Sequence, residues 1–303
     1  MISFPRFVFK IVDIAFDKAQ NGKSYGEVVS KKDISYDDTI ERCKLDIYCK
    51  EFDNTRKRPI IVNFHGGGFL AGDKKHRRGI ANYFINKIGD IFVVNPNYRL
   101  CEKDTFPAFA QDAAKALKWV EDNAEEYGFD LTKVLLCGDS AGAHIASQQI
   151  TIMLNEGLGE KLGCVKNNIK IKGAFLNCGP YDTRSALTQK VLLGMAHKIG
   201  KKVTGVNCKD LNAVEKYEYI NELAPINWIT SDFPVCFFAH TKADFFCPEH
   251  GRVMIDKLAK LGVKSYEYYS TEKNDIHCWN LTQSSKSGQK CMEKVVEYYK
   301  SII

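Results

Sequence analysis

The chain has 303 residues, of which 45% are hydrophobic and 26% are charged, and its formal net charge is +6. These proportions are ordinary for a folded protein, and they exclude collagen-like, coiled-coil and intrinsically disordered classes. A length near 300 residues suits one α/β domain that carries an insertion, so we expect residues 1–303 to form a single domain.

The basic residues are scattered except for two short runs, Arg56–Arg58 and Lys74–Arg78. No aromatic residues alternate with them in a way that would stack bases, so both runs are interpreted as solvated loops and no nucleic-acid partner is expected. The eleven cysteines include no C-x-x-C pair. We therefore expect no metal site, and we expect free thiols in a reducing compartment.

Charged residues, among them Arg6, Lys10 and Asp13, interrupt the apolar N-terminal stretch. This pattern does not fit a signal peptide. No apolar run approaches the length that spans a bilayer. The sequence therefore predicts a cytoplasmic protein without stable membrane insertion.

Apolar residues recur at helical spacing over residues 7–19, and polar and apolar residues alternate over residues 33–50, as in antiparallel strands near a sheet edge. Five nearly continuous apolar runs and one more polar run follow. Continuous runs are typical of strands that are buried on both faces, as in a parallel sheet covered by helices. The six runs are Ile60–Phe64, Ile91–Val94, Val134–Cys137, Gly173–Leu176, Val235–Ala239 and Ser265–Tyr269.

Helices are predicted within residues 107–126, from Ser140 to about Leu154, and over residues 249–261 and 286–303. Gly157 and Gly159 are expected to end the helix that follows Ser140. Residues 181–225 contain no strand-like run. We interpret them as an insertion over the carboxyl edge of a mostly parallel sheet, where loops carry function.

The strongest chemical signal is Gly138-Asp139-Ser140-Ala141-Gly142, which matches G-x-S-x-G. It directly follows one strand-like run and precedes a helical segment, and this is the setting in which the motif presents a nucleophilic serine on a strained turn. The flanking glycines leave room for that turn. We therefore predict Ser140 as a nucleophile and expect the Asp139 side chain to point elsewhere.

A second glycine-rich segment, His65-Gly66-Gly67-Gly68-Phe69, follows the first buried strand. Attack on an ester carbonyl creates an oxyanion, which needs backbone N–H donors that are already in place. Glycines let those donors approach the oxygen closely. His65 is expected to shape this loop, and His144 is expected to pack or to form hydrogen bonds.

A serine hydroxyl needs a base within hydrogen-bond reach. With this elbow motif the chain order is serine, acid, histidine. His277 lies in the loop between the last strand and the last helix, so we predict it as the base in preference to His197, His240 and His250. Asp244 follows the preceding strand and is the predicted acid, whereas Asp275 and Asp182 are rivals.

Together these residues resemble the hormone-sensitive-lipase-like esterases and lipases and related bacterial carboxylesterases. The resemblance extends from about residue 40 and includes Asn97–Leu100 and Phe106–Ala108 with Asp112. Two features depart from this family. Ala243 stands where the family often has glycine before the acid, and residues 245–248 are more similar to the wider esterase and feruloyl-esterase-like relatives than to the lipase subgroup.

The resemblance implies an α/β-hydrolase fold, with Gly67, Gly68 and Ala141 as the oxyanion-hole donors. It also implies a helical cap formed by residues 1–24 and 181–225. The expected function is hydrolysis of short- to medium-chain carboxylic esters through an acyl-enzyme, with a small-molecule substrate and no metal or organic cofactor. Two alternatives stay open, an amidase or arylformamidase with the same triad and a non-catalytic binding protein, and the oligomeric state is left open, with a homodimer as one option.

Overall fold

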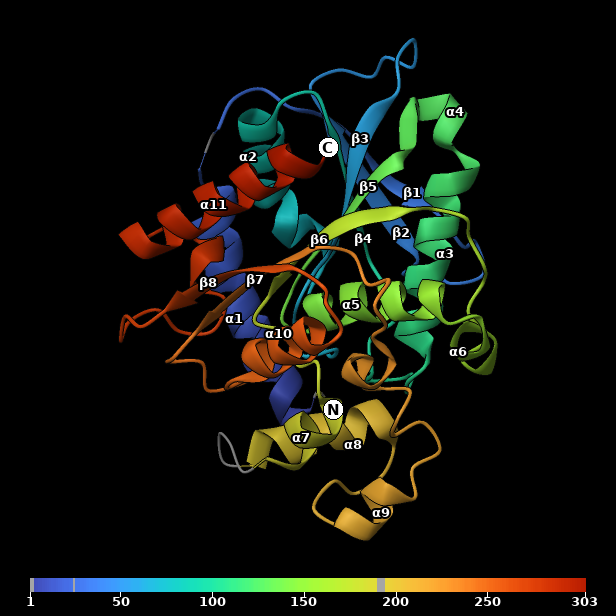
Figure 1. The fold of residues 1–303 in the computed structure, drawn as a ribbon, viewed down its shortest axis with the longest axis vertical. Coiled ribbons are helices and arrows are strands. Elements are labelled where there is room, and N and C mark those ends of the chain that lie inside the picture. The colour runs from blue at the N-terminus through green and yellow to red at the C-terminus, as the bar shows by residue number, and fades with distance from the viewer. Residues whose placement is uncertain (1–2, 24, 190–193) are drawn as a thin grey trace.

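The computed structural model describes residues 3–23, 25–189 and 194–303, and its strands form one eight-stranded sheet in the order β1-β2-β4-β3-β5-β6-β7-β8 (Figure 1). Strands β3 to β8 pair in parallel, whereas β1 and β2 are antiparallel at one edge. The predicted mostly parallel sheet with antiparallel edge strands is confirmed. The strands are β1 (Val29–Ser35), β2 (Lys44–Cys49), β3 (Arg58–Phe64), β4 (Phe92–Pro96), β5 (Phe129–Asp139), β6 (Ile171–Asn177), β7 (Cys236–Thr241) and β8 (Ser265–Ser270).

Helices cover both faces of this sheet (Figure 1). The α-helices are α1 (Phe4–Asn21), α2 (Arg78–Ile88), α3 (Ala108–Asp122), α4 (Ala124–Tyr127), α5 (Ala141–Leu154), α6 (Glu156–Lys161), α7 (Thr183–Thr188), α8 (Met195–Thr204), α9 (Leu211–Glu215), α10 (His250–Lys260) and α11 (Lys286–Ile302). Short 3-10 helices include η1 (Lys74–Arg77), η3 (Pro225–Trp228) and η4 (Trp279–Leu281).

Two hydrophobic cores lie on opposite faces of the sheet. Successive side chains of a strand point to opposite faces, so Ile60 and Val62 of β3 join the core with α3, α5 and α10, whereas Ile61 joins the core with α2 and α11. Because both faces are covered, the strands read as continuous apolar runs. Strand β3 lies between β4 and β5, so the direction of strand succession reverses there, and ligands bind at the carboxyl ends of the strands at such a switch point.

Helix α5 ends at Leu154, as predicted, but Gly157 and Gly159 do not form the stop, because both lie inside the short helix α6 that follows. At the end of α5 the Asn155 side-chain amide donates to the carbonyl oxygen of Thr151 at 2.7 Å. That bond satisfies an acceptor in the last turn, which has no partner within the helix.

The interpretation of both basic runs as solvated loops is also wrong in part. Arg58 lies on β3 and is buried, while Lys74 and Arg77 lie on η1 and are buried. Buried cations need partners, and Lys74 Nζ lies 2.6 Å from a carboxylate oxygen of Asp46. Arg77 pairs with Asp139, which precedes the predicted nucleophile.

Helix α1 contacts α8, and α7 to α9 lie beyond the carboxyl end of the sheet, at the bottom of Figure 1. These helices fall within the segments 1–24 and 181–225, for which a cap is predicted. Residues 1, 2, 24 and 190–193 of those segments lie outside the described residues.

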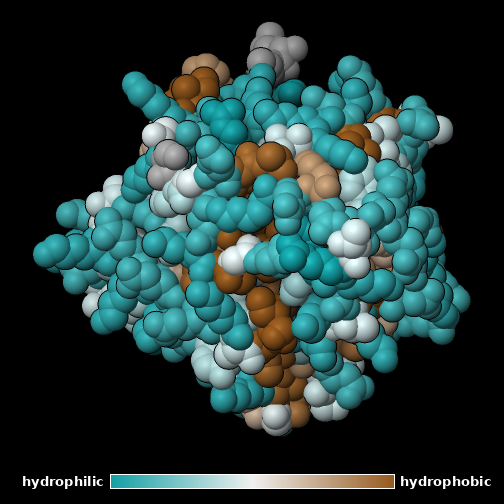
Figure 2. Space-filling model, turned by 90° about the horizontal axis from the view of Figure 1, so that it is seen from above, coloured by the Kyte–Doolittle hydropathy of each residue, from teal (hydrophilic) through white to brown (hydrophobic). Residues whose placement is uncertain are grey.

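The face seen from above, on the side away from α7 to α9, is mostly hydrophilic, with hydrophobic residues visible as a band across its middle (Figure 2). Within the described ranges, no helix combines the length and apolar character needed to cross a bilayer. All eleven cysteines are free thiols, as the sequence predicts.

Candidate active site

Ser140 occupies the sharp turn between β5 and α5. Its backbone has φ 52° and ψ −120°, a strained conformation for a residue with a side chain. The two glycines of the motif are required by space, because a Cβ at Gly142 would lie 2.0 Å from the carbonyl oxygen of Phe64, and one at Gly138 would lie 2.2 Å from that of Gly142. The Ser140 N–H donates to Asn177 on the adjacent strand at 2.8 Å, which fixes the turn.

Asp244 and His277 are in direct contact. Each carboxylate oxygen of Asp244, just after β7, lies 2.9 Å from His277 Nδ1. The backbone N–H groups of Phe246 and Cys247 donate to the same carboxylate at 2.8 and 2.9 Å. Burial alone would raise the pKa of Asp244, but His277 and these donors outweigh burial and hold it below its ordinary value. The carboxylate is therefore ionised at neutral pH and orients the imidazole through Nδ1.

Ser140 and His277 line the same cavity, which has a volume of about 130 Å³. Both residues are described, and no hydrogen bond joins the Ser140 hydroxyl to the His277 ring. Catalytic hydrogen bonds are often formed only when substrate is bound. The arrangement therefore places the imidazole at the cavity into which the serine opens, with Nε2 left for proton transfer.

The rival acid Asp275 has different partners. Its carboxylate accepts hydrogen bonds from the hydroxyls of Ser270, Ser285 and Ser287, and its backbone oxygen accepts one from Thr241. Asp275 therefore ties the loop before His277 to β8 and to the start of α11. The other rival, Asp182, caps α7, where its carboxylate accepts from the backbone N–H of Ser185.

The predicted oxyanion-hole residues border the space around Ser140. Gly67 lines the cavity that contains His277, and Gly68 and Ala141 line a second cavity of about 60 Å³, which Ser140 also borders. Gly67 and Gly68 have φ values of 122° and 59°, which favour glycine. The geometry gathers these residues at the serine, and their role as donors remains a prediction.

His65 lies at the start of the glycine loop and packs against Tyr98. Its ring stacks on Tyr98 with a centroid separation of 4.4 Å, and the Tyr98 hydroxyl donates to the His65 carbonyl oxygen at 2.6 Å. Burial, together with the nearby Arg42, lowers the pKa of His65 to about 3, so the ring is neutral at neutral pH. His65 therefore shapes the loop, as expected, and carries no charge there.

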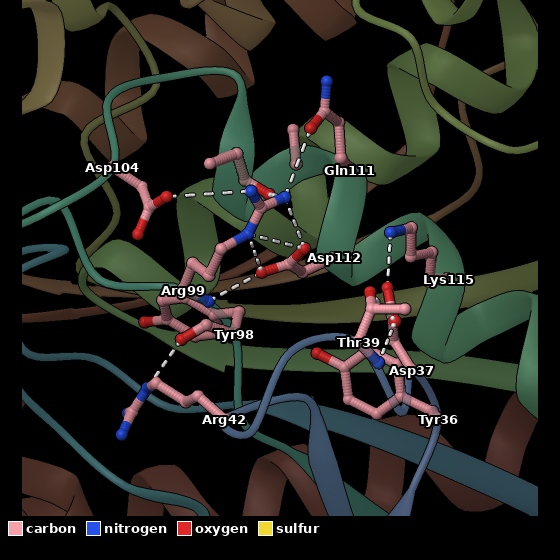
Figure 3. Close-up of polar contacts among 12 residues, drawn as sticks. Tyr36, Asp37, Thr39, Arg42, Tyr98, Arg99, Asp104, Gln111, Asp112 and Lys115 are labelled. Atoms are coloured by element: carbon pink, nitrogen blue, oxygen red, sulfur yellow. Dashed lines mark hydrogen bonds and ion pairs between the residues drawn. The ribbon is translucent and has the colours of Figure 1, made fainter.

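The Asn97–Leu100 motif has a structural role that the sequence left open. Arg42 donates to the Tyr98 carbonyl oxygen at 2.7 Å, and Arg99 pairs with Asp112 of α3 at 2.8 Å (Figure 3). Asp112 also accepts from the Arg99 backbone N–H at 2.8 Å. The motif thus anchors the segment after β4 to α3, and it holds the Tyr98 ring against the His65 ring.

Arg77 is a site residue that the sequence analysis missed. Its guanidinium forms two hydrogen bonds of 2.6 Å with the Asp139 carboxylate, and both residues line the cavity with Ser140 and His277. This bidentate geometry is the strongest form of the Arg–carboxylate pair. The Asp139 carboxylate is thus bound by Arg77, and it borders the same cavity as Ser140. No local sequence pattern indicates this pair, because the two residues are 62 positions apart in the chain.

Apolar side chains from the predicted cap line the 60 Å³ cavity. Phe9 of α1, Leu187 of α7 and Ile199 of α8 face it together with Phe69 and Phe246. His144 lies outside this lining and makes hydrogen bonds to Pro180 and Gln148, in agreement with its predicted packing role. The site therefore combines a serine, an oriented imidazole and a small apolar recess.

A serine elbow at the carboxyl edge of this sheet, with an acid–histidine pair beside it, defines the α/β-hydrolase fold. The fold is shared with esterase B from Lactobacillus rhamnosis, whose crystal structure superimposes with a TM-score of 0.82 at 20% identity, covering 97% of this chain and 92% of that one. The BD-FAE family model matches residues 45–258, and the chain belongs to that family. The match ends before His277.

Two curated relatives from Mycobacterium tuberculosis carry esterase names, and they confirm the predicted resemblance to this group. The probable carboxylic ester hydrolase LipM is 24% identical over 271 residues, which is 87% of this chain and 59% of LipM. Esterase LipI is 38% identical over 90 residues, which is 29% of this chain and 28% of LipI. The chain therefore matches less than two thirds of the length of either relative.

Proposed function

We propose that the chain is a serine carboxylic ester hydrolase that acts on short- to medium-chain esters through an acyl-enzyme on Ser140. The observation that carries this proposal is the contact between Asp244 and His277 Nδ1 at the cavity that Ser140 also lines. The names of LipM and LipI, and the esterase of similar fold, support the same class of reaction.

In the proposed reaction, His277 Nε2 accepts the Ser140 proton as the hydroxyl oxygen attacks the ester carbonyl carbon. Asp244 keeps the other ring nitrogen protonated and stabilises the imidazolium. Backbone N–H groups of Gly67, Gly68 and Ala141 stabilise the oxyanion, each contributing about 3–4 kcal/mol when well placed. His277 then protonates the leaving alcohol, and a water molecule hydrolyses the acyl-enzyme by the same route.

The small recess supports the proposed chain-length range. A cavity of about 60 Å³ lined mainly by apolar side chains accommodates a short acyl group more readily than a long one. The L. rhamnosis esterase is also described as inhibited by a tributyrin phosphonate, which agrees with a short acyl chain at the corresponding site.

Hydrolysis of a series of nitrophenyl esters tests this proposal. Turnover is expected to peak at short acyl chains and to fall by at least about 10³-fold in Ser140→Ala. A fluorophosphonate should label the wild-type chain and not the variant. A peak at long, emulsified chains would refute the chain-length range. Faster turnover of an aryl formamide would favour the amidase alternative, and absence of labelling would refute the acyl-enzyme.

A further inference from the structure

Two cysteine thiols lie close to the ring of His277. Cys178 follows β6, and Cys278 follows His277 itself, one hundred residues further along the chain. One ligand atom from each of Cys178, His277 and Cys278 lies within 4.8 Å of the other two. The Cys278 backbone N–H donates to Cys178 Sγ at 3.4 Å, which holds the two thiols together.

Both thiols are buried, with 3% of Cys178 and 4% of Cys278 exposed. A thiophilic divalent cation displaces thiol protons as it binds, so a buried pair of thiols can supply two of its ligands.

The ligand set fits such a cation. Two cysteine sulfurs and one imidazole nitrogen are three of the four ligands of a tetrahedral zinc site. With Zn–S bonds of about 2.3 Å, sulfur atoms around a tetrahedral ion lie about 3.8 Å apart, so a movement of about 1 Å closes the present arrangement. Two thiolates neutralise the double charge of the ion, and therefore the buried site gains no net charge.

The cation also has a route to the site. Cys278 lines the cavity that contains Ser140 and His277, so an ion that enters where substrate would enter reaches the thiol directly. We propose that Cys178, Cys278 and His277 form an inhibitory binding site for a thiophilic divalent cation such as Zn²⁺. The inhibitory effect rests on the proposed function, in which His277 is the base.

Coordination of the cation by either nitrogen of the His277 ring would inhibit the proposed reaction. A cation on Nε2 occupies the lone pair that accepts the serine proton, and a cation on Nδ1 breaks the contact with Asp244. On binding, the two thiol protons pass to solvent and no redox step occurs. The fourth position is filled by water or by a carboxylate oxygen.

Cobalt is the probe for the first test, because thiolate-bound Co²⁺ has a charge-transfer absorption that needs no enzymatic activity. The chelator-treated full chain should bind one Co²⁺ with this absorption, and Zn²⁺ should displace it. Cys178→Ala and Cys278→Ala, each alone, should weaken cobalt binding at least 10-fold. The matched control is Cys101→Ala, because Cys101 is equally buried but borders a different cavity.

Activity provides the second test. Saturating Zn²⁺ should remove more than nine tenths of wild-type esterase activity, EDTA should restore it, and either cysteine variant should need at least 10-fold more Zn²⁺ for the same loss. If one variant fails to fold, the other still decides. A cobalt spectrum without the thiolate band, or a band that survives in a folded variant, would overturn the site.

The two proposals fail in different ways. Ser140→Ala should retain cobalt binding, because the serine is not a ligand. A chain that binds cobalt through thiolates but hydrolyses no ester would retain the cation site and refute the esterase. A chain that hydrolyses esters but binds no cobalt through thiolates would support the esterase and refute the cation site.

Discussion

Asp13 of α1 allows a sharp test of how this helix is held. The carboxyl group is buried next to Arg77, and this cation and the Gly72 backbone N–H favour its ionised form. Burial nevertheless dominates these attractions and raises the pKa of Asp13 from 3.8 to about 6. The folded state therefore binds this proton more tightly than the unfolded state does.

The sign of the effect follows from that difference. Between about pH 4 and pH 6 the folded chain holds more protons at Asp13 than the unfolded chain, so this group makes stability fall as pH rises. A rise from 3.8 to about 6, at about 1.4 kcal/mol per pKa unit, amounts to about 3 kcal/mol above pH 7. Asp13→Asn removes the titration and preserves the shape of the side chain.

We expect Asp13→Asn to be up to about 3 kcal/mol more stable than the wild type at pH 7.5, and the two to converge near pH 4. Urea unfolding at both pH values, followed by tryptophan fluorescence, measures this. Asp17→Asn, on the same helix, is the control and should change stability by less than about 0.5 kcal/mol. If Asp13→Asn is less stable at pH 7.5, or if its difference from the wild type does not depend on pH, attraction to Arg77 outweighs burial and the reasoning is wrong.

Three other predictions concern the site and its supports. Asp244→Asn should lower kcat on a nitrophenyl ester about 10⁴-fold with little change in KM, because the imidazole tautomer is lost; a loss below tenfold would contradict the predicted acid. Gly68→Ala should lower activity at least tenfold and reduce the free energy of unfolding by about 1 kcal/mol, because its Cβ would lie 2.3 Å from the Phe9 ring and its φ is positive. Unchanged kinetics would show that α1 can move away from the new methyl group without loss of activity. Asp112→Ala should cost about 3 kcal/mol in urea unfolding, because the partly buried Arg99 guanidinium loses its closest carboxylate and keeps only the longer ion pair with Asp104. A cost under 1 kcal/mol would mean that water or Asp104 replaces the lost carboxylate.

Sequence patterns predicted the strands of the sheet because the burial of each strand is reflected in its own run of apolar residues. A strand covered on both faces is apolar at nearly every position, so Ile60–Phe64 and Val134–Cys137 could be identified without knowing their neighbours. The turn at Ser140 could be predicted equally well, because Gly138 and Gly142 are required by close contacts with residues near Ser140 and with the adjacent strand. Helix α2, by contrast, went unpredicted: it begins only at Arg78, the last residue of the basic run, and the rest of that run forms the 3-10 helix η1.

The partners of buried charges could not be predicted in this way. Arg77 and Asp139 are 62 residues apart in the chain, and nothing in either local pattern indicates that they meet. The same holds for Cys178 and Cys278, whose proximity depends on β6 and the loop after β8 ending at the same edge. Spacing in the sequence ranked His277 and Asp244 first, and only the fold shows that they touch.

Phe9 borders both recesses at Ser140 and lies against Gly68, so one aromatic ring of α1 divides the space in which the proposed ester substrate would bind. The partition belongs to a helix at the very start of the described chain and not to the sheet that carries the serine. A substitution on α1 that shifts the Phe9 ring would therefore change both recesses without altering Ser140, Asp244 or His277.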